Sequence, residues 1–144
     1  MRQTFFFLLL LASTALSAQV SAIVGDWINI DDKTGTEQSI VHIYKGTDGL
    51  YYGKVKQILV AGYEDQKCTE CEGADYMKPI VGMIIIRGMK AEGDELTGGR
   101  VLDPNNGKFY YARIYIKDGN LVLRGSLDKR GFIGRNQTWR RAKQ

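Results

Sequence analysis

Cys68 and Cys71 are the first residues of this chain whose type and spacing point to chemistry. A Cys-x-x-Cys pair can form a short disulfide, act as a redox site or supply two metal ligands. A thioredoxin-like redox site needs a strand before the pair and a helix that begins at it. Here the flanking residues are polar and partly acidic, which also disfavours a reactive thiolate. A structural disulfide is the favoured interpretation, with redox and metal-binding roles as alternatives.

The other polar residues form no catalytic pattern. His42 is the only histidine, and no serine or cysteine motif is placed to use it. Two cysteines and one histidine also leave a four-ligand metal site incomplete. Asp103, with Arg100 and Arg124, is the one polar cluster, but turn geometry explains residues 103–107, because Asp caps the backbone, Pro sets φ and Gly accepts a positive φ. We therefore expect a non-enzymatic protein with no cofactor and no metal, and a binding or catalytic role for Asp103 is the alternative.

Residues 1–18 have the pattern of a secretory signal peptide, with a basic start, an apolar run at 5–11 and small residues before the cleavage point. The apolar run is shorter than the roughly 20 residues of a membrane-spanning helix. We expect cleavage after Ala18, with cleavage after Ala22 as the alternative, and no lipid anchor, because no cysteine lies near either site. The protein is then periplasmic or secreted, and an oxidising compartment of that kind favours the disulfide.

Residues 19–144 have the size of one domain. Residues 1–18 hold one of the 20 basic residues and none of the 16 acidic ones, so the remainder has a net charge near +3, too mild to indicate nucleic-acid binding. Basic residues predominate from Arg124 onward. Such an end can face anionic lipid headgroups or polysaccharide in the envelope, or be a solvated surface.

The elements that position these residues are strands. Apolar and polar residues alternate with a period of two, and Gly- and Asp-rich turns recur about every ten residues, as in a sandwich or barrel. The apolar segment 80–89 is the best candidate for a central strand, and residues 61–79 form a long loop. The predicted strands are 27–30, 38–45, 50–60, 80–89, 95–102, 108–117, 121–127 and 133–141.

Several segments, in order along the chain, resemble DUF2147, a family of uncharacterised exported bacterial proteins. That family is similar to the lipocalin-like barrels of the calycin superfamily, which share a Gly-x-Trp start. The resemblance implies an all-β, eight-stranded antiparallel up-and-down barrel, and it implies no activity. The segments are Gly25-x-Trp27, residues 50–55, Cys68-x-x-Cys71, Gly88-Met89, residues 99–104 with 106–110, residues 123–125 and Gln137-Thr138-Trp139-x-Arg141.

The resemblance also implies a closure between the first and last strands, in which an arginine of the last strand lies over the tryptophan of the first. If Trp139 points inward, alternation places Arg141 or Arg135 on its face, and if Trp139 points outward it favours Arg140. We expect Arg141 over Trp27. An ordinary core role for Trp27 is the alternative.

An eight-stranded barrel is either filled by side chains or holds one small ligand. The first hypothesis is a carrier or sensor of a small apolar molecule such as a lipid or fatty acid. The second is a filled barrel that contacts an envelope protein or polymer through loop 61–79, expected to lie across one mouth, and through the basic end. Alternation nominates these cavity-lining residues, with Arg87 a partner for an acidic head: Tyr51, Val55, Gln57, Met83, Ile85, Arg87, Tyr110, Ile114 and Leu123.

Overall fold

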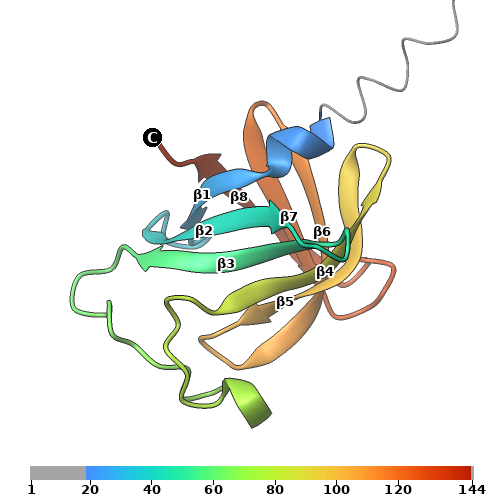
Figure 1. The fold of residues 1–144 in the computed structure, drawn as a ribbon. Helices are drawn as coiled ribbons and strands as arrows, with labels where there is room; N and C mark the ends of the chain where they lie inside the picture. The colour runs from blue at the N-terminus through green and yellow to red at the C-terminus, as the bar shows by residue number, and fades with distance from the viewer. Residues whose placement is uncertain (1–18, 144) are drawn as a thin grey trace, which may run out of the picture.

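The computed structural model describes residues 19–143, so the predicted signal peptide, residues 1–18, lies outside the described residues. Eight antiparallel strands follow one another along the chain and close into a barrel (Figure 1). The prediction of an eight-stranded up-and-down barrel is confirmed. The strands are β1 (Gly25–Ile30), β2 (Glu37–Lys45), β3 (Tyr51–Ile58), β4 (Ile84–Glu92), β5 (Glu95–Asp103), β6 (Lys108–Lys117), β7 (Asn120–Ser126) and β8 (Gly134–Arg141).

The hairpin between β6 and β7 shows how local sequence makes these strands neighbours. Lys117 pairs with Asn120, which leaves Asp118 and Gly119 as a two-residue turn. Both have a positive φ, of 52° and 78°. A type I′ turn requires this conformation at both central positions, and its twist matches that of the flanking strands.

The barrel closes where β1 meets β8. Within the described residues this seam has only two paired positions, Trp27 with Arg141 and Ile28 with Arg140. The backbone N–H of Ala142 adds one hydrogen bond to Asp26, at 3.0 Å. Because the backbone ladder is short here, side-chain contacts across the seam matter more than elsewhere.

The core lies inside the barrel and receives side chains from all eight strands. Trp27 and Trp139 are the largest of its fully buried members, and Ile43, Ile86 and Ile114 are also inaccessible to solvent. A helical turn at residues 19–23, which the sequence pattern did not predict, adds Val20 and Ile23 to the same cluster. No helix in residues 19–143 is long and apolar enough to cross a membrane.

The connection between β3 and β4 is longer than predicted. Residues 80–83 belong to it rather than to β4, because Gly82 has a φ of +92°, which interrupts an extended chain. Ile80 and Met83 are nevertheless buried, which explains why their apolar character resembled that of a strand. We call residues 59–83 the disulfide loop. It contains the short 3-10 helix η1 (Gly73–Asp75) and one bridge between Lys67 and Pro79.

Candidate functional site

The end of the barrel that helix 19–23 covers, which we call the base, has a contact between the first and last strands. The guanidinium carbon of Arg141 lies 4.0 Å from the ring centroid of Trp27, a cation–π distance. Arg141 also donates to the backbone carbonyls of Val24, at 3.3 Å, and Ala22. The Trp27 Nε1–H donates to the carbonyl of Ile23 at 2.8 Å. Trp27 and Arg141 thereby fasten helix 19–23 across the base.

The structure brings most of the predicted cavity-lining residues into the core. Tyr110 is half-buried, and its hydroxyl accepts a hydrogen bond from Asn106 at 2.9 Å. Trp139 is buried and donates from Nε1 to the side chain of Gln137 at 3.1 Å. Buried side chains in mutual contact therefore occupy the interior around the two tryptophans. The predicted residues in this cluster are Tyr51, Val55, Met83, Ile85, Ile114 and Leu123.

Gln57 is exposed, so its predicted inward orientation is corrected. In the pairing of β3 with β2, Ile40 lies opposite Gln57 and Val41 lies opposite Val55, which leaves Lys56 without a partner. One extra residue of this kind is a β-bulge, and it reverses the alternation beyond it. Lys56 and Gln57 therefore both lie outside, and Ile58 is buried again.

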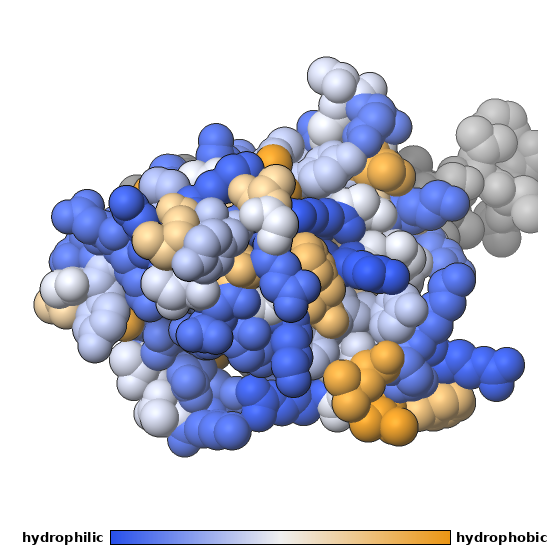
Figure 2. Space-filling view, turned by 90° about the horizontal axis from the view of Figure 1, so that it is seen from below, coloured by the Kyte–Doolittle hydropathy of each residue, from blue (hydrophilic) through white to orange (hydrophobic). Residues whose placement is uncertain are grey.

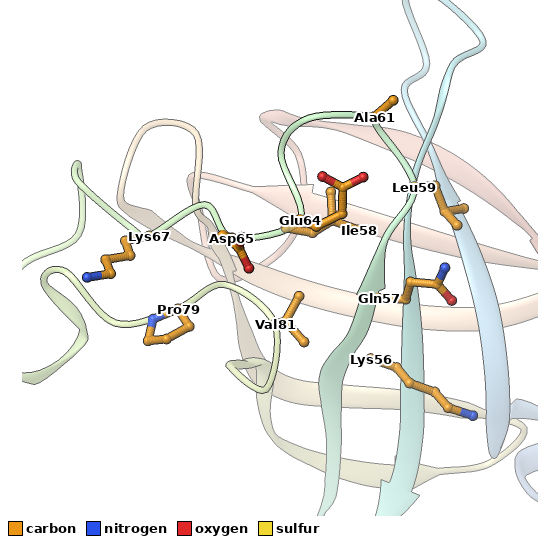
Figure 3. A pocket seen from close by; sticks show the side chains of 10 residues that line it. All are labelled: Lys56, Gln57, Ile58, Leu59, Ala61, Glu64, Asp65, Lys67, Pro79 and Val81. Carbon is orange, nitrogen blue, oxygen red and sulfur yellow. The ribbon is translucent and has the colours of Figure 1, made fainter.

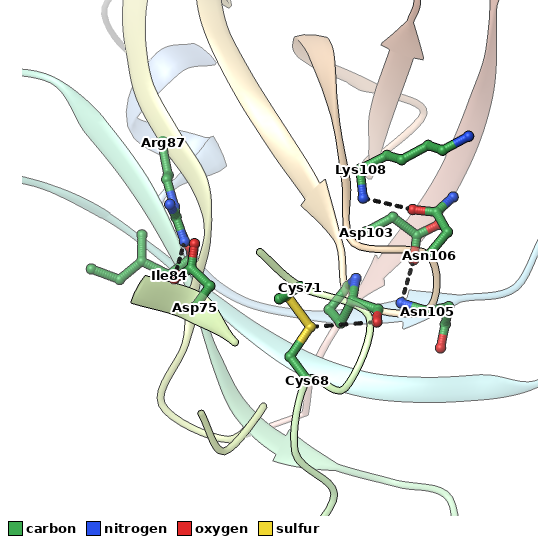
Figure 4. The surroundings of a disulfide bond; sticks show 10 residues. Cys68, Cys71, Asp75, Ile84, Arg87, Asp103, Asn105, Asn106 and Lys108 are labelled. Atoms are coloured by element: carbon green, nitrogen blue, oxygen red, sulfur yellow. Dashed lines mark hydrogen bonds and ion pairs between the residues drawn. A yellow bond between two sulfur atoms is a disulfide. The ribbon is translucent and has the colours of Figure 1, made fainter. Parts of the chain in front are cut away.

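Arg87 also lies outside the barrel, contrary to the prediction that it lines the cavity. It pairs across β4 and β5 with Arg100, which is exposed. Its guanidinium lies 5.1 Å from the ring centroid of Phe109 and forms an ion pair of 3.1 Å with Asp75 (Figure 4). Arg87 therefore anchors the disulfide loop to the outer face of β4 and cannot meet a ligand inside the barrel.

Cys68 and Cys71 form the predicted disulfide, with a Cα–Cα distance of 5.3 Å. Both are buried in the core cluster, and the Sγ of Cys68 lies 3.6 Å from the carbonyl oxygen of Pro104 in the β5–β6 turn (Figure 4). Gly107, at a φ of +71°, lies so close to Glu70 that a Cβ would collide with its carbonyl. Only glycine allows this approach, so the loop packs against this turn.

A cleft of about 740 Å³ opens outside the barrel, between β3 and the arms of the disulfide loop (Figure 3). The β4-facing side of β3 is paired up to Val55, whose backbone exchanges hydrogen bonds with Gly82 and Met83 at 2.7 and 2.9 Å. Within the described residues, 56–58 have no partner in β4. The cleft combines apolar side chains with charges of both signs, from Lys56, Gln57, Ile58, Leu59, Ala61, Glu64, Asp65, Lys67, Pro79 and Val81.

Beside the cleft, Asp26 binds the side chains of Lys56 and His42 on the outer face of β1 to β3. Its carboxylate oxygens lie 2.7 Å from Lys56 Nζ and 2.6 Å from His42 Nδ1. The hydrogen bond from Lys56 is the main cause that lowers the pKa of Asp26, and His42 adds to it, against the opposing effect of desolvation. In the part of the chain that the structure describes, no hydroxyl or thiol side chain hydrogen-bonds to His42. This His–Asp pair lacks the nucleophile of a hydrolase triad.

A second concavity, of about 190 Å³, lies on the outer face of β5, β6 and β7, and we call it the basic groove. Arg124 crosses it, with Nε 2.7 Å from the carbonyl of Gly131 and NH1 3.1 Å from the side chain of Asn136. Arg113 is held by Glu95 through two hydrogen bonds of 2.7 and 2.6 Å, which raise the pKa of Arg113. The basic residues after Arg124 are evident in the sequence, whereas the groove that they line is not. Its lining is Thr97, Gly98, Tyr111, Ala112, Arg113, Arg124, Ser126, Lys129, Arg130 and Gly131.

The closed eight-stranded meander, with a helical turn and a Trp–Arg contact at its base, defines a lipocalin-like barrel. Protein HP1028 from the human pathogen Helicobacter pylori, described as belonging to the lipocalin family, has a similar structure. The TM-score is 0.73 at 20% sequence identity, over 84% of this chain and 83% of that chain. At this identity the similarity shows the fold, which is one that suits small-ligand binding.

The particular family follows from the sequence. Residues 25–141 match DUF2147, described as an uncharacterized protein conserved in bacteria, and the chain belongs to that family. The resemblance found in the sequence is thereby confirmed. A search of curated proteins found no match. A bacterial family and a disulfide are consistent with a location outside the cytoplasm.

Proposed function

We propose that this chain is a non-catalytic binding protein of the bacterial envelope that recognises its partner in the cleft beside the disulfide loop. The contrast between interior and exterior carries the proposal. Trp27, Val41 and Ile114 inside the barrel have no exposed surface, whereas the cleft outside is open and about 740 Å³ in volume. A carrier of a small apolar molecule needs its free volume inside the barrel.

The chemistry of the cleft fits an extended segment of another protein. Its apolar residues can receive alternate side chains of such a segment, and its lysines and carboxylates can pair with charges of either sign. The end of β3, residues 56–58, runs beside the cleft without a partner in β4. An extended peptide can add to a strand of this kind through main-chain hydrogen bonds, with side-chain pockets that supply specificity.

The walls of the cleft are held in place before a partner binds. The buried disulfide and the contact of Gly107 with Glu70 fasten the loop to the β5–β6 turn. The ion pair of Arg87 with Asp75 fastens it to β4, and Lys56 on the opposite wall is held by Asp26. A preformed site loses less conformational entropy on binding than a mobile one, so it binds its partner with higher affinity.

Selection from a displayed library of random peptides tests the proposal, with affinities of the selected peptides measured by calorimetry. Val81→Asp, in the cleft, is expected to weaken binding at least about tenfold, because it places a charge among apolar contacts. Val24→Asp is the matched control, because Val24 at the base is also 38% exposed. Equal affinity of both variants would contradict a site in the cleft.

Native mass spectrometry of protein purified from its host separates this proposal from the small-ligand carrier. We expect the mass of the bare chain. A bound molecule of lipid size that the Val81→Asp variant retains would instead support a ligand inside the barrel.

A further inference from the structure

The loop between β7 and β8, residues 127–133, displays an apolar patch. Leu127, Phe132 and Ile133 are 67%, 78% and 63% exposed. Leu127 and Ile133 lie side by side, because the N–H of Leu127 donates to the carbonyl of Ile133 at 2.8 Å. The space-filling view shows hydrophobic side chains gathered into a compact patch at one edge of the molecule, next to hydrophilic ones (Figure 2). A clustered exposed patch of this kind marks an interaction site more often than single exposed residues do.

Hydrogen bonds fix the conformation of loop 127–133. The carboxylate of Asp128 accepts hydrogen bonds from the backbone N–H groups of Phe132, at 3.0 Å, and Ile133, at 2.7 Å. These bonds lower the pKa of Asp128. Arg124 binds the carbonyl of Gly131 from below, and Ser126 Oγ donates to the carbonyl of Asp128 at 2.8 Å. Hydrogen bonds of these polar groups therefore fix the loop in a conformation that exposes three apolar side chains to solvent.

Cations surround the patch. Lys129 and Arg130 are exposed, and within residues 19–143 neither forms an ion pair. They line the basic groove, so the groove and the patch share this loop. The carboxylates nearby are engaged, Asp128 with the loop amides and Glu95 with Arg113. Asp128 still contributes one negative charge, so loop 127–133 carries two cations against one carboxylate and keeps a net charge of +1.

We propose that loop 127–133 docks the barrel on an anionic lipid bilayer. Leu127, Phe132 and Ile133 enter the interface, and Lys129 and Arg130 contact headgroup phosphates. Apolar side chains flanked by cations combine the two contributions that drive interfacial binding, buried apolar area and attraction to anionic lipid. An acidic protein would match the cations, but three apolar side chains at a loop tip fit a bilayer interface better. This inference does not depend on the peptide cleft, which lies between β3 and the disulfide loop.

Vesicle co-sedimentation tests the docking, with protein purified from its host and vesicles of phosphatidylcholine alone or mixed equally with phosphatidylglycerol. We expect binding to the anionic vesicles that weakens with added salt. The double variants Phe132→Ser with Ile133→Ser and Lys129→Gln with Arg130→Gln should each lower the partition coefficient by about tenfold or more. Only the charge variant should lose the preference for anionic vesicles.

Matched controls come from other exposed side chains. Tyr63→Ser with Tyr76→Ser removes two exposed aromatic rings from the disulfide loop, and Lys117→Gln removes a cation from the opposite end of the barrel. Both controls should keep wild-type partitioning. Phe132→Trp gives a direct readout, since its emission in excess of the wild-type emission from Trp27 and Trp139 should shift to shorter wavelength only with anionic vesicles. Absence of vesicle binding by the wild type, or equal losses in the controls, would overturn the proposal, and capture of an acidic protein without vesicle binding would favour a protein partner.

Discussion

The contact of Arg141 with Trp27 can be tested quantitatively because the seam that it spans has only two paired strand positions among the described residues. Arg141→Met keeps the apolar stem and removes the guanidinium 4.0 Å from the indole, with its bonds to the carbonyls of Ala22 and Val24. A cation–π contact contributes about 0.5–2 kcal/mol, and a hydrogen bond from a charged group adds about 1.5–3 kcal/mol where solvent is excluded. Because Arg141 is exposed and solvent screens these contacts, we expect a loss of only about 2 kcal/mol in the free energy of unfolding.

Trp27→Leu is expected to cost more. Trp27 is fully buried, so the change removes most of a large core side chain as well as its hydrogen bond to Ile23. Large-to-small core substitutions of this kind cost about 3 kcal/mol. In the double variant, the cation–π contact is lost only once, so the two losses should fall short of additivity by about 1 kcal/mol.

Urea denaturation followed by far-ultraviolet circular dichroism measures all four proteins without relying on tryptophan emission. Arg140→Met is the matched control, because Arg140 is the neighbouring residue on the opposite face of β8 and pairs with Glu37 in solvent. An exposed ion pair contributes about 0–1 kcal/mol. Equal losses for Arg140→Met and Arg141→Met, or strict additivity of Trp27→Leu with Arg141→Met, would refute the closure.

Three further predictions concern other parts of the chain. Joint replacement of Cys68 and Cys71 by Ala should lower the free energy of unfolding by only about 2 kcal/mol in the chain-entropy account, since the closed loop is short. Urea denaturation of the variant beside the non-reduced wild type measures this loss, and the variant should still be folded at 25 °C. Lys56→Met should raise the pKa of Asp26, as measured by an NMR titration. The lowered pKa of Asp26 stabilises the fold at a pH above its ordinary value of 3.8, and this contribution is lost as the pH falls through the lower folded value, so the variant should lose less stability in acid. N-terminal sequencing of the exported protein should begin at Gln19, because the helical turn that follows packs on the barrel and its Ala22 carbonyl accepts a bond from Arg141 of β8.

Strand number and order were predictable because local sequence determines them. Turn residues such as Asp118 and Gly119 adopt the positive φ that a tight hairpin needs, and each hairpin places one strand beside the next. The disulfide was predictable from compartment and from the absence of a redox context. Segment 80–83 was assigned to a strand because burial under a loop and burial in a sheet select the same apolar residues.

Side-chain orientation was less predictable, because alternation holds only while the strand is regular. A single unpaired residue, Lys56, reverses the face on which Gln57 lies. Arg87 follows another irregularity, since Gly53 pairs with Ile86 and Lys54 with Ile84, which leaves one extra residue in β4. Both shifts depend on the register with a neighbouring strand. The cleft and the basic groove depend on residues distant in sequence, so no local pattern predicted them.

The direction of the strands separates stability from recognition in this fold. Because successive strands run in opposite directions, helix 19–23 and the turns after β2, β4 and β6 belong to the base, while the disulfide loop and loop 127–133 belong to the opposite end. An ion pair of 3.4 Å between Arg135 and Asp32 links β8 to the β1–β2 turn at that end. Arg141→Met should therefore lower the free energy of unfolding and leave peptide and vesicle binding of the folded protein unchanged. Val81→Asp should weaken peptide binding and Phe132→Ser should weaken vesicle binding, and neither should lower the free energy of unfolding, since both side chains are exposed. Loss of vesicle binding by fully folded Arg141→Met protein would show that the base controls the loops, and would contradict this division.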